Sequence, residues 1–428
     1  MQEYVALAVF SVVYVLIIGR GRFGVPIWVA MLIGAALMVG LQVTDIQGVY
    51  EAVNLEVIAF LFGMFSIVSA LERAGVLRLI AMKMLSWAKT PSQLLMAFVV
   101  GMGVLSAFLV NDTIALLGIP LAILVAKHAG IKPTVLLLAL AFGVTVGSVM
   151  TPIGNPQNLL IAIDSGFELP FRTFLFYLAV PTVANLFVTY YILKAYFRKD
   201  LPSKLQYAPV AAEVVGGESI ANPRQARIAV YITIATLGGF LVSELLHVYK
   251  VADFSISIVA MLGAAALYAL SSERTQLLRN VDYSVLVFFA AMFVVTSSMW
   301  QSGAVSIITG WLPDPSPADE AQSINVITAA SLALSQVLSN VPFVALYNFV
   351  MIDSGFGEEH VAQWLMLAAA STVAGNLTIL GAASNVIVIE AAEARGVRAF
   401  SYFEFAKIGS VITAANIAIY YAFIYFVL

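Results

Sequence analysis

Two groups of polar residues occur inside hydrophobic sequence, and they repeat each other along the chain. The first comprises residues 111–113 (Asn-Asp-Thr) and 151–158 (Thr-Pro-Ile-Gly-Asn-Pro-Gln-Asn), and the second comprises residues 339–342 (Ser-Asn-Val-Pro) and 378–385 (Thr-Ile-Leu-Gly-Ala-Ala-Ser-Asn). Polar groups are costly within a membrane and usually mark a path for a substrate or an ion. The duplication therefore indicates a membrane transporter with two related halves.

Three blocks of residues match between the halves in the same order. The pairs Ser106–Ser335, Leu109–Leu338 and Asn111–Asn340 share an offset of 229, the pairs Thr151–Thr378, Gly154–Gly381 and Asn158–Asn385 share an offset of 227, and Phe171–Phe400, Phe174–Phe403 and Phe176–Phe405 return to 229. Three ordered matches are hard to obtain by chance, so we predict an internal duplication.

The composition is that of a polytopic membrane protein. Apolar residues make up 61% of the 428 and charged residues 11%, whereas soluble proteins carry about 25% charged residues, and the mean hydropathy is +0.97. About 20 apolar residues cross the hydrocarbon core as a helix. Ten spans are predicted, near residues 4–19, 24–42, 55–71, 134–163, 173–193, 227–246, 253–271, 283–300, 363–390 and 403–428.

Two further apolar stretches do not fit as single spans. Residues 93–126 are interrupted by the polar residues 111–113, and the 13 residues of 114–126 would reach only about 20 Å as a helix. A re-entrant hairpin, which enters and leaves on one side of the membrane with its polar tip at mid-depth, accounts for both properties. Residues 323–352 are interpreted in the same way. The alternative is a pair of short spans joined by a turn in water.

The distribution of basic residues supports this layout. With both stretches as hairpins, only Arg172 and Lys250 fall on one side, and by the positive-inside rule the other side is predicted to be cytoplasmic. That side carries nineteen of the 21 basic residues: Arg20, Arg22, Arg73, Arg78, Lys83, Lys89, Lys127, Lys132, Lys194, Arg198, Lys199, Lys204, Arg224, Arg227, Arg274, Arg279, Arg395, Arg398 and Lys407. We expect a multi-pass protein of the cytoplasmic (inner) membrane with both termini external.

Each half then contains three spans, a hairpin, a broken span and a last span. Five crossings are an odd number, so the second half starts from the opposite face and the repeats are inverted. The predicted fold is an all-α polytopic membrane protein with a first inverted repeat over 1–197, a cytoplasmic linker over 198–226 and a second inverted repeat over 227–428.

Helix breaks are predicted near the middle of spans 134–163 and 363–390. Pro152, Gly154 and Pro156 interrupt the first span, and Gly375 and Gly381 relax the second. A broken helix presents free N–H groups and free carbonyls that attract polar solutes or ions. Two hairpin tips facing two broken helices would enclose one central site. Ordinary kinks with satisfied polar groups are the alternative.

Asp112 is the acidic residue most clearly placed within hydrophobic sequence, because no Lys or Arg lies between Lys89 and Lys127. A carboxyl group in such a place is expected either to take up and release a proton near neutral pH or to pair with a cation. Asp112 is our candidate for the proton-coupling residue. Its alternative role is to cap the second arm of the hairpin.

Catalytic and cofactor chemistry finds little support in the sequence. The chain has no cysteine, which excludes disulfides, zinc thiolates and thiol redox chemistry. A hydrolase within the membrane would need a His-Glu-x-x-His motif, paired membrane aspartates or a Ser-His pair, and none is present. We expect no enzyme activity, no cofactor, no resident metal and no nucleic acid partner.

Two motifs resemble those of the ion transporter superfamily, which includes arsenite/antimonite permeases, sodium/proton antiporters and divalent anion:sodium symporters. Residues 105–113 (Leu-Ser-Ala-Phe-Leu-Val-Asn-Asp-Thr) with Pro120 are similar to the first hairpin of arsenite permeases, and residues 339–342 are similar to their second hairpin. The resemblance covers nearly the whole chain. It implies two inverted repeats, each with a re-entrant hairpin and an unwound helix, a homodimer, and a transport domain that moves against a scaffold as an elevator.

The sequence departs from two branches of that superfamily. Divalent anion symporters carry Ser-Asn-Thr at both hairpins and both breaks, whereas the tips here read Asn-Asp-Thr and Ser-Asn-Val. The breaks at 151–158 and 381–385 differ from those of arsenite permeases and resemble those of general anion permeases. The resemblance therefore points to the superfamily and leaves the cargo open.

Our hypothesis is proton-coupled efflux of arsenite or antimonite. At neutral pH both solutes are chiefly neutral trihydroxides, and hydroxyl and amide side chains are suited to bind them. The alternatives are an oxyanion or carboxylate permease and a sodium/proton antiporter. Beyond the lipid bilayer and a homodimer, a cytoplasmic ATPase subunit docked on the linker is a partner that the sequence leaves open. The predicted substrate-binding residues, beside Asp112 for the proton, are Asn111, Thr113, Thr151, Asn155, Asn158, Asn340, Thr378, Ser384 and Asn385.

Overall fold

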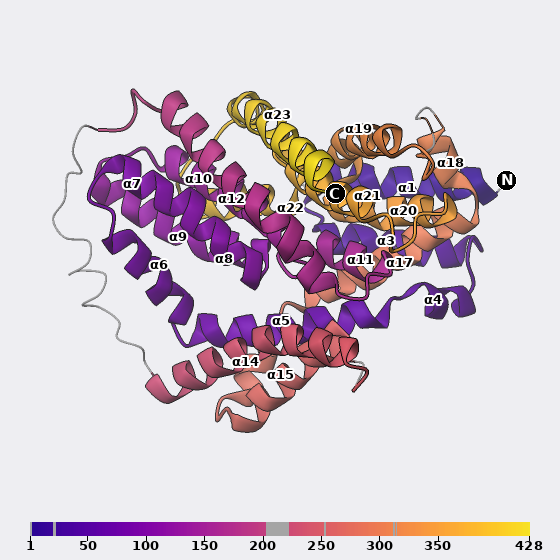
Figure 1. The fold of residues 1–428 in the computed structure, drawn as a ribbon, viewed down its shortest axis with the longest axis horizontal. Helices are drawn as coiled ribbons and strands as arrows, with labels where there is room; N and C mark the ends of the chain where they lie inside the picture. The colour runs from indigo at the N-terminus through magenta and orange to yellow at the C-terminus, as the bar shows by residue number, and fades with distance from the viewer. Residues whose placement is uncertain (1, 20–22, 203–221, 252–253, 311–312, 314) are drawn as a thin grey trace.

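The computed structural model describes residues 2–19, 23–202, 222–251, 254–310, 313 and 315–428, and every regular element in these ranges is a helix (Figure 1). Within the described residues, nine helices are long and apolar enough to cross a membrane, and five shorter apolar helices accompany them. The predicted all-α polytopic membrane fold is confirmed.

The two halves of the chain follow the same order of elements, except that the first hairpin arm is divided into α7, a π-helical turn and α8 in the first half and is the single helix α19 in the second. The first half consists of α1 (Gln2–Ile18), α3 (Ile27–Gly40), α4 (Ile46–Ala52), α5 (Leu55–Arg73), α6 (Val76–Ser86), α7 (Pro91–Met96), a π-helical turn (Ala97–Gly101), α8 (Met102–Leu109), α9 (Asn111–Ala129), α10 (Pro133–Gly147), a 3-10 turn (Ser148–Met150), α11 (Pro156–Asp164) and α12 (Pro170–Tyr196). The second half consists of α14 (Pro223–Val248), α15 (Ile256–Leu270), α16 (Arg274–Arg279), α17 (Tyr283–Gln301), α18 (Ala304–Thr309), α19 (Glu320–Leu338), α20 (Asn340–Asp353), α21 (Val361–Ala374), a 3-10 turn (Ile379–Gly381), α22 (Ala383–Glu393) and α23 (Tyr402–Val427).

Helices of one half pack against helices of the other half, and these contacts occur in equivalent pairs. Helix α5 packs on α15, and its counterpart α17 packs on α3. In the same way α9 packs on α22 and its counterpart α20 packs on α11, while α12 and α23 pack on each other. In Figure 1 the yellow α23 lies beside the magenta α12, although more than 200 residues separate them in the chain. The halves are therefore interleaved about an approximate two-fold relation, and neither forms a separate globule.

Both hairpins are longer than predicted. The first runs over 91–129 instead of 93–126, and the second over 320–353 instead of 323–352. The expectation of a 13-residue second arm is wrong, because the polar residues 111–113 form the first turn of α9 and only Val110 separates the arms. Helix α9 has 19 residues and would reach about 28 Å, so length alone does not separate a re-entrant arm from a crossing.

Several predicted spans are short helices in the structure. The spans 4–19, 24–42 and 253–271 correspond to α1, α3 and α15, which have 17, 14 and 15 residues. At about 1.5 Å per residue these helices reach about 21 to 26 Å. The predicted linker 198–226 falls largely on residues 203–221, which lie outside the described ranges. Its assignment, together with the repeat bounds 1–197 and 227–428, stays a prediction.

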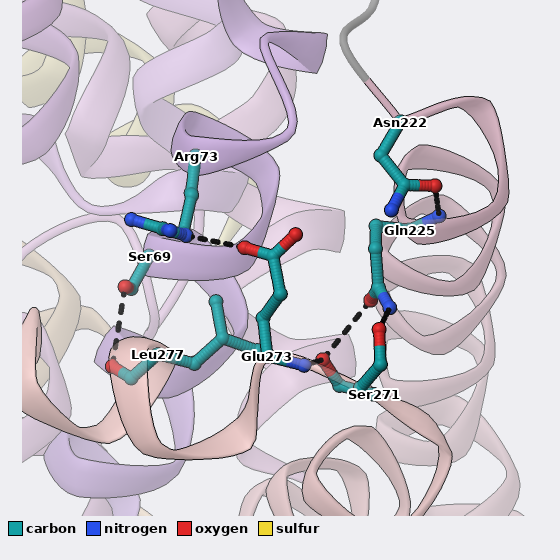
Figure 2. Close-up of polar contacts among 8 residues, drawn as sticks. Ser69, Arg73, Asn222, Gln225, Ser271, Glu273 and Leu277 are labelled. Carbon is teal, nitrogen blue, oxygen red and sulfur yellow. Dashed lines mark hydrogen bonds and ion pairs between the residues drawn. The ribbon is translucent and has the colours of Figure 1, made fainter.

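Polar contacts tie α5 to the second half at the side predicted to be cytoplasmic (Figure 2). Nε of Arg73 lies 2.6 Å from Oε2 of Glu273, and the Ser69 hydroxyl donates to the carbonyl of Leu277 at 3.5 Å. Gln225 at the start of α14 accepts from the Ser271 hydroxyl at 3.0 Å. Because Arg73 and Glu273 are 40% and 32% exposed, their ion pair contributes at most about 1 kcal/mol and serves mainly to fix orientation.

Burial corrects the third block of the sequence match. At the offset of 229, Phe174, which is fully buried, would correspond to Phe403, which is 83% exposed. At an offset of 231 the fully buried Phe174 corresponds to the fully buried Phe405, and the buried Asn185 corresponds to the buried Asn416. The connection before α23 is longer than the one before α12, and this difference shifts the register. Runs of phenylalanines are common at lipid-facing helix ends. The phenylalanine pattern alone therefore did not give the correct offset between the two halves.

Candidate solute site between the hairpin tips

The two hairpin tips have the same unusual backbone conformation. Val110 and Ser339 both have φ of 64°, with ψ of 123° and 160°. Positive φ is uncommon for residues other than glycine and is a strong outlier for a β-branched residue such as valine. Such a residue costs about 1 to 3 kcal/mol and persists only where its surroundings enforce it. The matching strain at offset 229 marks the two tips as equivalent points of the fold.

Side chains within the break between α10 and α11 form hydrogen bonds to its main chain. The amide Nδ2 of Asn158 donates to the carbonyls of Ser148, Val149 and Thr151 at 3.2, 3.2 and 3.1 Å. Oδ1 of Asn155 accepts from the backbone N–H of Asn158 at 2.8 Å and so caps α11. These bonds satisfy carbonyls that the missing helical turn would otherwise leave unpaired.

The second break repeats part of this arrangement. Nδ2 of Asn385 donates to the carbonyl of Gly375 at 2.7 Å, which is the counterpart of the bond from Asn158 to Ser148. The Thr378 hydroxyl donates to Oε1 of Gln336 at 2.8 Å. Its counterpart in the first half is the bond from the Thr151 hydroxyl to the carbonyl of Ala107.

Each hairpin tip contacts the break of its own half. The backbone N–H of Asn111 donates to the carbonyl of Gly154 at 2.8 Å, and the Ser339 hydroxyl lies 3.4 Å from the carbonyl of Gly381. Gly154 and Gly381 are the glycines in the middle of the two broken spans. The tips therefore lie level with the middle of two predicted crossings, as a re-entrant hairpin requires.

One cavity of about 560 Å³ separates the two tips. The first hairpin and first break contribute amide and carboxyl groups to its wall, and the second hairpin and second break contribute amides and hydroxyls. Residues of α1, of the start of α3 and of α17 complete the wall. The polar residues that line it are Tyr14, Asn111, Asp112, Gln157, Asp282, Ser284, Gln336, Ser339, Asn340 and Ser384. Among the described residues that line it there is no Lys, Arg or His.

Two buried polar atoms on the wall find no hydrogen-bond partner within the described part of the chain. They are Oδ1 of Asn340 and the hydroxyl of Ser384, and their residues are 3% and 1% exposed. Buried polar groups in folded proteins are almost always paired. Both atoms can accept a hydrogen bond, and each is covered in this arrangement, so a solute would reach them only after their side chains turn toward the cavity.

Helix α1 is connected directly to the second tip. The Tyr14 hydroxyl donates to the carbonyl of Leu338, the residue before the strained Ser339, at 2.6 Å. The cavity rim includes the exposed residues Gly24 and Pro26 beside α3, and Asp282 before α17. Both segments adjoin loops whose arginines are predicted to be cytoplasmic, so the cavity opens toward that predicted side.

The structure brings some of the predicted site residues together and separates others. Asn111, Asp112, Asn340 and Ser384 line the cavity. The others do not: Thr151, Asn155, Asn158, Thr378 and Asn385 bond to the backbone or side chains at the breaks, and Thr113 is half-buried outside the lining. Their binding role stays a prediction.

Sequence reasoning missed six polar residues of the cavity wall. Gln157 and Ser339 lie inside the motifs already identified, and Gln336 lies one helical turn before the second tip, so proximity to the motif was a usable signal. Tyr14, Asp282 and Ser284 come from α1 and the start of α17. No local pattern distinguishes them, because only the packing of the two halves brings them to the site.

Interleaved repeats, two strained hairpin tips and two broken helices around a polar cavity define a membrane transporter. A protein-family model described as a citrate transporter matches residues 13–374. The chain belongs to this family, and its resemblance to the ion transporter superfamily is confirmed.

Several known proteins are similar to this chain over most of its length. An uncharacterized transporter of Mycobacterium tuberculosis is 28% identical over 440 residues and covers 100% of both chains. The silicon efflux transporter LSI3 of Oryza sativa is 28% identical and covers 90% of this chain and 88% of its own. A candidate transporter of Dictyostelium discoideum named arsB is 22% identical and covers 88% and 83%.

Two solved structures share the fold. MtrF of Neisseria gonorrhoeae, described with a class of antimetabolite efflux pumps, aligns with a TM-score of 0.56 at 11% identity and covers 91% of this chain and 83% of its own. The YdaH transporter of Alcanivorax borkumensis aligns with a TM-score of 0.51 at 14% identity and covers 86% and 84%. At these identities the likeness concerns the fold alone.

Proposed function

We propose that the protein is a proton-coupled efflux transporter for arsenite or antimonite in the cytoplasmic membrane. The observation that carries the proposal is the wall of the cavity between the hairpin tips. Its polar groups are amides, hydroxyls and two carboxyls, and no basic side chain is among the described residues that line it. A neutral trihydroxide can donate and accept hydrogen bonds at such a wall without a compensating charge.

The orphan acceptors on the second hairpin and second break support a solute of this kind. Oδ1 of Asn340 and the hydroxyl of Ser384 lie on the same wall and have no partner among the described residues. When these side chains turn toward the cavity, a hydroxyl of the solute would donate to them and remove the cost of leaving them unpaired. In this proposal Asn111 and Gln157 bind the solute from the first half, and Asp112 carries the proton beside it.

The relatives are consistent with a hydroxide as cargo. One is named a silicon efflux transporter, and dissolved silicon at neutral pH is chiefly a neutral tetrahydroxide. Another carries the name arsB. Silicic acid and arsenious acid are both small, neutral and able to donate hydrogen bonds through hydroxyl groups. A cavity wall of amide and hydroxyl groups would therefore suit both solutes.

Uptake into everted membrane vesicles tests this function, because efflux from the cell becomes accumulation in the vesicle. Arsenite is measured by mass detection for the wild type and Asp112→Asn, with and without an imposed proton gradient. We expect gradient-dependent accumulation that Asp112→Asn loses. Absence of arsenite and antimonite accumulation by the wild type would reject the proposed cargo, and sodium-stimulated proton flux without arsenite would favour a sodium/proton antiporter.

A carboxylate such as citrate is the second candidate cargo, because the matching family model is described as a citrate transporter. A free tricarboxylate would face Asp112 and Asp282 without a basic partner among the described lining residues, which is unfavourable in a partly desolvated cavity. Citrate would therefore need to enter together with cations. Competition by citrate in the same vesicles separates the candidates, since a neutral hydroxide and a tricarboxylate have different charge and size.

A further inference from the structure

The hydroxyl of Thr372 connects the second half of the chain to the first break. Thr372 lies near the end of α21, is fully buried, and accepts from Nδ2 of Asn155 and Nε2 of Gln157, both at 3.3 Å. It donates to Oδ1 of Asn158 at 3.4 Å. A hydroxyl has one donor and two acceptor positions, and here amides of the first break occupy all three.

The hydrogen bonds of Asn158 fix the direction of this set. Nδ2 of Asn158 already donates to three backbone carbonyls at the break, so Oδ1 is the end of the amide that faces Thr372. An amide oxygen only accepts, so Thr372 donates its single hydroxyl proton to Asn158. The same hydroxyl can then only accept from Gln157, which must turn an N–H group toward α21.

Gln157 is the member of this set that lines the solute cavity. Its side chain is 3% exposed, and within the described part of the chain its one side-chain hydrogen bond is the bond to Thr372. Asn155, in contrast, keeps two further bonds, to the carbonyl and the hydroxyl of Ser148 at 3.3 and 2.9 Å. Loss of the Thr372 hydroxyl would therefore leave Asn155 in place and release Gln157.

The equivalent position in the first half behaves differently. At the offset of 227, Thr145 corresponds to Thr372 and Ser384 corresponds to Gln157. The helices pack in equivalent pairs, α11 on α21 and α22 on α10. The Thr145 hydroxyl nevertheless donates to the carbonyl of Ala141 in its own helix at 2.9 Å, and Ser384 finds no partner among the described residues. The bond across the halves therefore belongs to Gln157 and does not follow from the duplication.

We propose that Thr372 is a positioning residue for solute binding, which holds Gln157 in place and sets the direction of its amide. The inference rests on the proposed role of Gln157 in binding the solute. With one N–H directed at Thr372, the carbonyl oxygen Oε1 of Gln157 is left to accept from a hydroxyl of the solute. Thr372 is not part of the cavity lining, so its effect on the solute passes through Gln157.

Nuclear magnetic resonance of the glutamine side chains tests the contact without any solute. Full-length protein carries isotopically labelled glutamine in lipid nanodiscs, and the Gln157 amide is the signal that Gln157→Leu removes. In the wild type we expect its protons to exchange with water about tenfold more slowly than those of the exposed Gln276. Thr372→Val keeps the volume and removes the hydroxyl. It should speed the exchange by about three- to tenfold, as the loss of one neutral hydrogen bond requires.

Thr372→Ser and Thr145→Val are the matched controls. Thr372→Ser keeps the hydroxyl and should restore the wild-type exchange of the Gln157 amide. Thr145→Val removes the equivalent hydroxyl, which bonds within its own helix, and should leave that signal unchanged. In everted vesicles Thr372→Val should raise the KM for arsenite by about three- to tenfold and leave the maximal rate within about twofold. Both controls should keep the wild-type KM.

The proposal is overturned if the Gln157 amide of the wild type exchanges as fast as that of Gln276, if Thr372→Val leaves its exchange unchanged, or if Thr145→Val raises the KM as much as Thr372→Val does. The first of these outcomes requires no substitution at Thr372, so a variant that fails to fold does not protect the proposal. A wild type that accumulates no arsenite would reject the cargo alone, because the exchange measurement contains no metalloid. Unchanged exchange together with active uptake would leave arsenite efflux standing without a role for Thr372.

Discussion

The side-chain amide of Asn185 in α12 donates to the backbone carbonyl of Asn416 in α23 at 3.3 Å, and the two residues occupy the same position in the two halves of the chain. A contact between equivalent residues places the approximate two-fold axis of the fold between them. On one side of this axis the hydroxyls of Thr182 and Tyr420 lie 2.8 Å apart, and on the other side lie their counterparts Thr413 and Thr189. The crossing of the last helices is therefore a buried polar contact between the repeats.

We predict that the bond between Thr182 and Tyr420 holds this crossing together. A double-mutant cycle of Thr182→Val and Tyr420→Phe should show a coupling free energy of about 1 kcal/mol, because both groups are buried and a neutral hydrogen bond contributes about 0.5 to 1.5 kcal/mol. Denaturant unfolding in mild detergent measures it. Tyr425→Phe changes the same group on the exposed face of α23 and should have no effect; additive effects of the two buried substitutions would refute the prediction.

A close backbone approach in α23 should make Gly409 irreplaceable. A Cβ atom there would collide with the carbonyl oxygen of Asn376 in the second break. We predict that Gly409→Ala destabilises the protein by about 1 to 3 kcal/mol, since backbone cannot yield as a flexible side chain can. The midpoint of thermal aggregation checks this. Gly238→Ala is the matched helical control, because a Cβ at Gly238 meets nothing within 4 Å, and equal stabilities of the two variants would contradict the prediction.

Removal of the Asn158 amide at the first break and removal of the Ser384 hydroxyl at the second should have different effects on stability and transport. Asn158→Ala leaves three buried carbonyls without their donor, and we predict a loss of stability of about 1 to 3 kcal/mol together with a loss of transport. Ser384→Ala removes a hydroxyl that has no partner in the described residues and lines the cavity. It should leave the unfolding midpoint unchanged and raise the KM for arsenite by about three- to tenfold, the equivalent of one neutral hydrogen bond.

Unfolding midpoints and vesicle uptake, measured on the same preparations, separate these two roles. Ser284→Ala serves as a control for the cavity wall, because Ser284 lines the opposite side at the start of α17. A KM that stays at the wild-type value in Ser384→Ala would remove Ser384 from the binding site. An unfolding midpoint that stays constant in Asn158→Ala would remove Asn158 from the frame of the break.

The sequence was sufficient for much of the fold and for part of the site. The repeated polar residues located both tips and both breaks, because polar groups are costly inside a membrane and occur there chiefly where the backbone is interrupted or a solute is bound. The sequence did not give the correct alignment of the third matched block, because phenylalanines that recur at similar spacing near the starts of α12 and α23 can be aligned at more than one offset. It also could not tell which amide residues line the cavity. Asn158 and Asn340 both donate to main-chain carbonyls beside a break, and only the packing of the two halves makes Asn340 part of the cavity lining and leaves Asn158 outside it.

Single cysteines should reveal which side the cavity faces, because the chain has no cysteine of its own. Ser284 lines the cavity near its rim, and Glu358 is exposed in the turn between α20 and α21. Given the predicted topology, a membrane-impermeant maleimide should label Ser284→Cys in everted vesicles and spare it in intact cells. Glu358→Cys should show the reverse pattern. Labelling of Ser284→Cys from outside intact cells, with Glu358→Cys protected there, would invert the assignment, and the cavity would then face the external side.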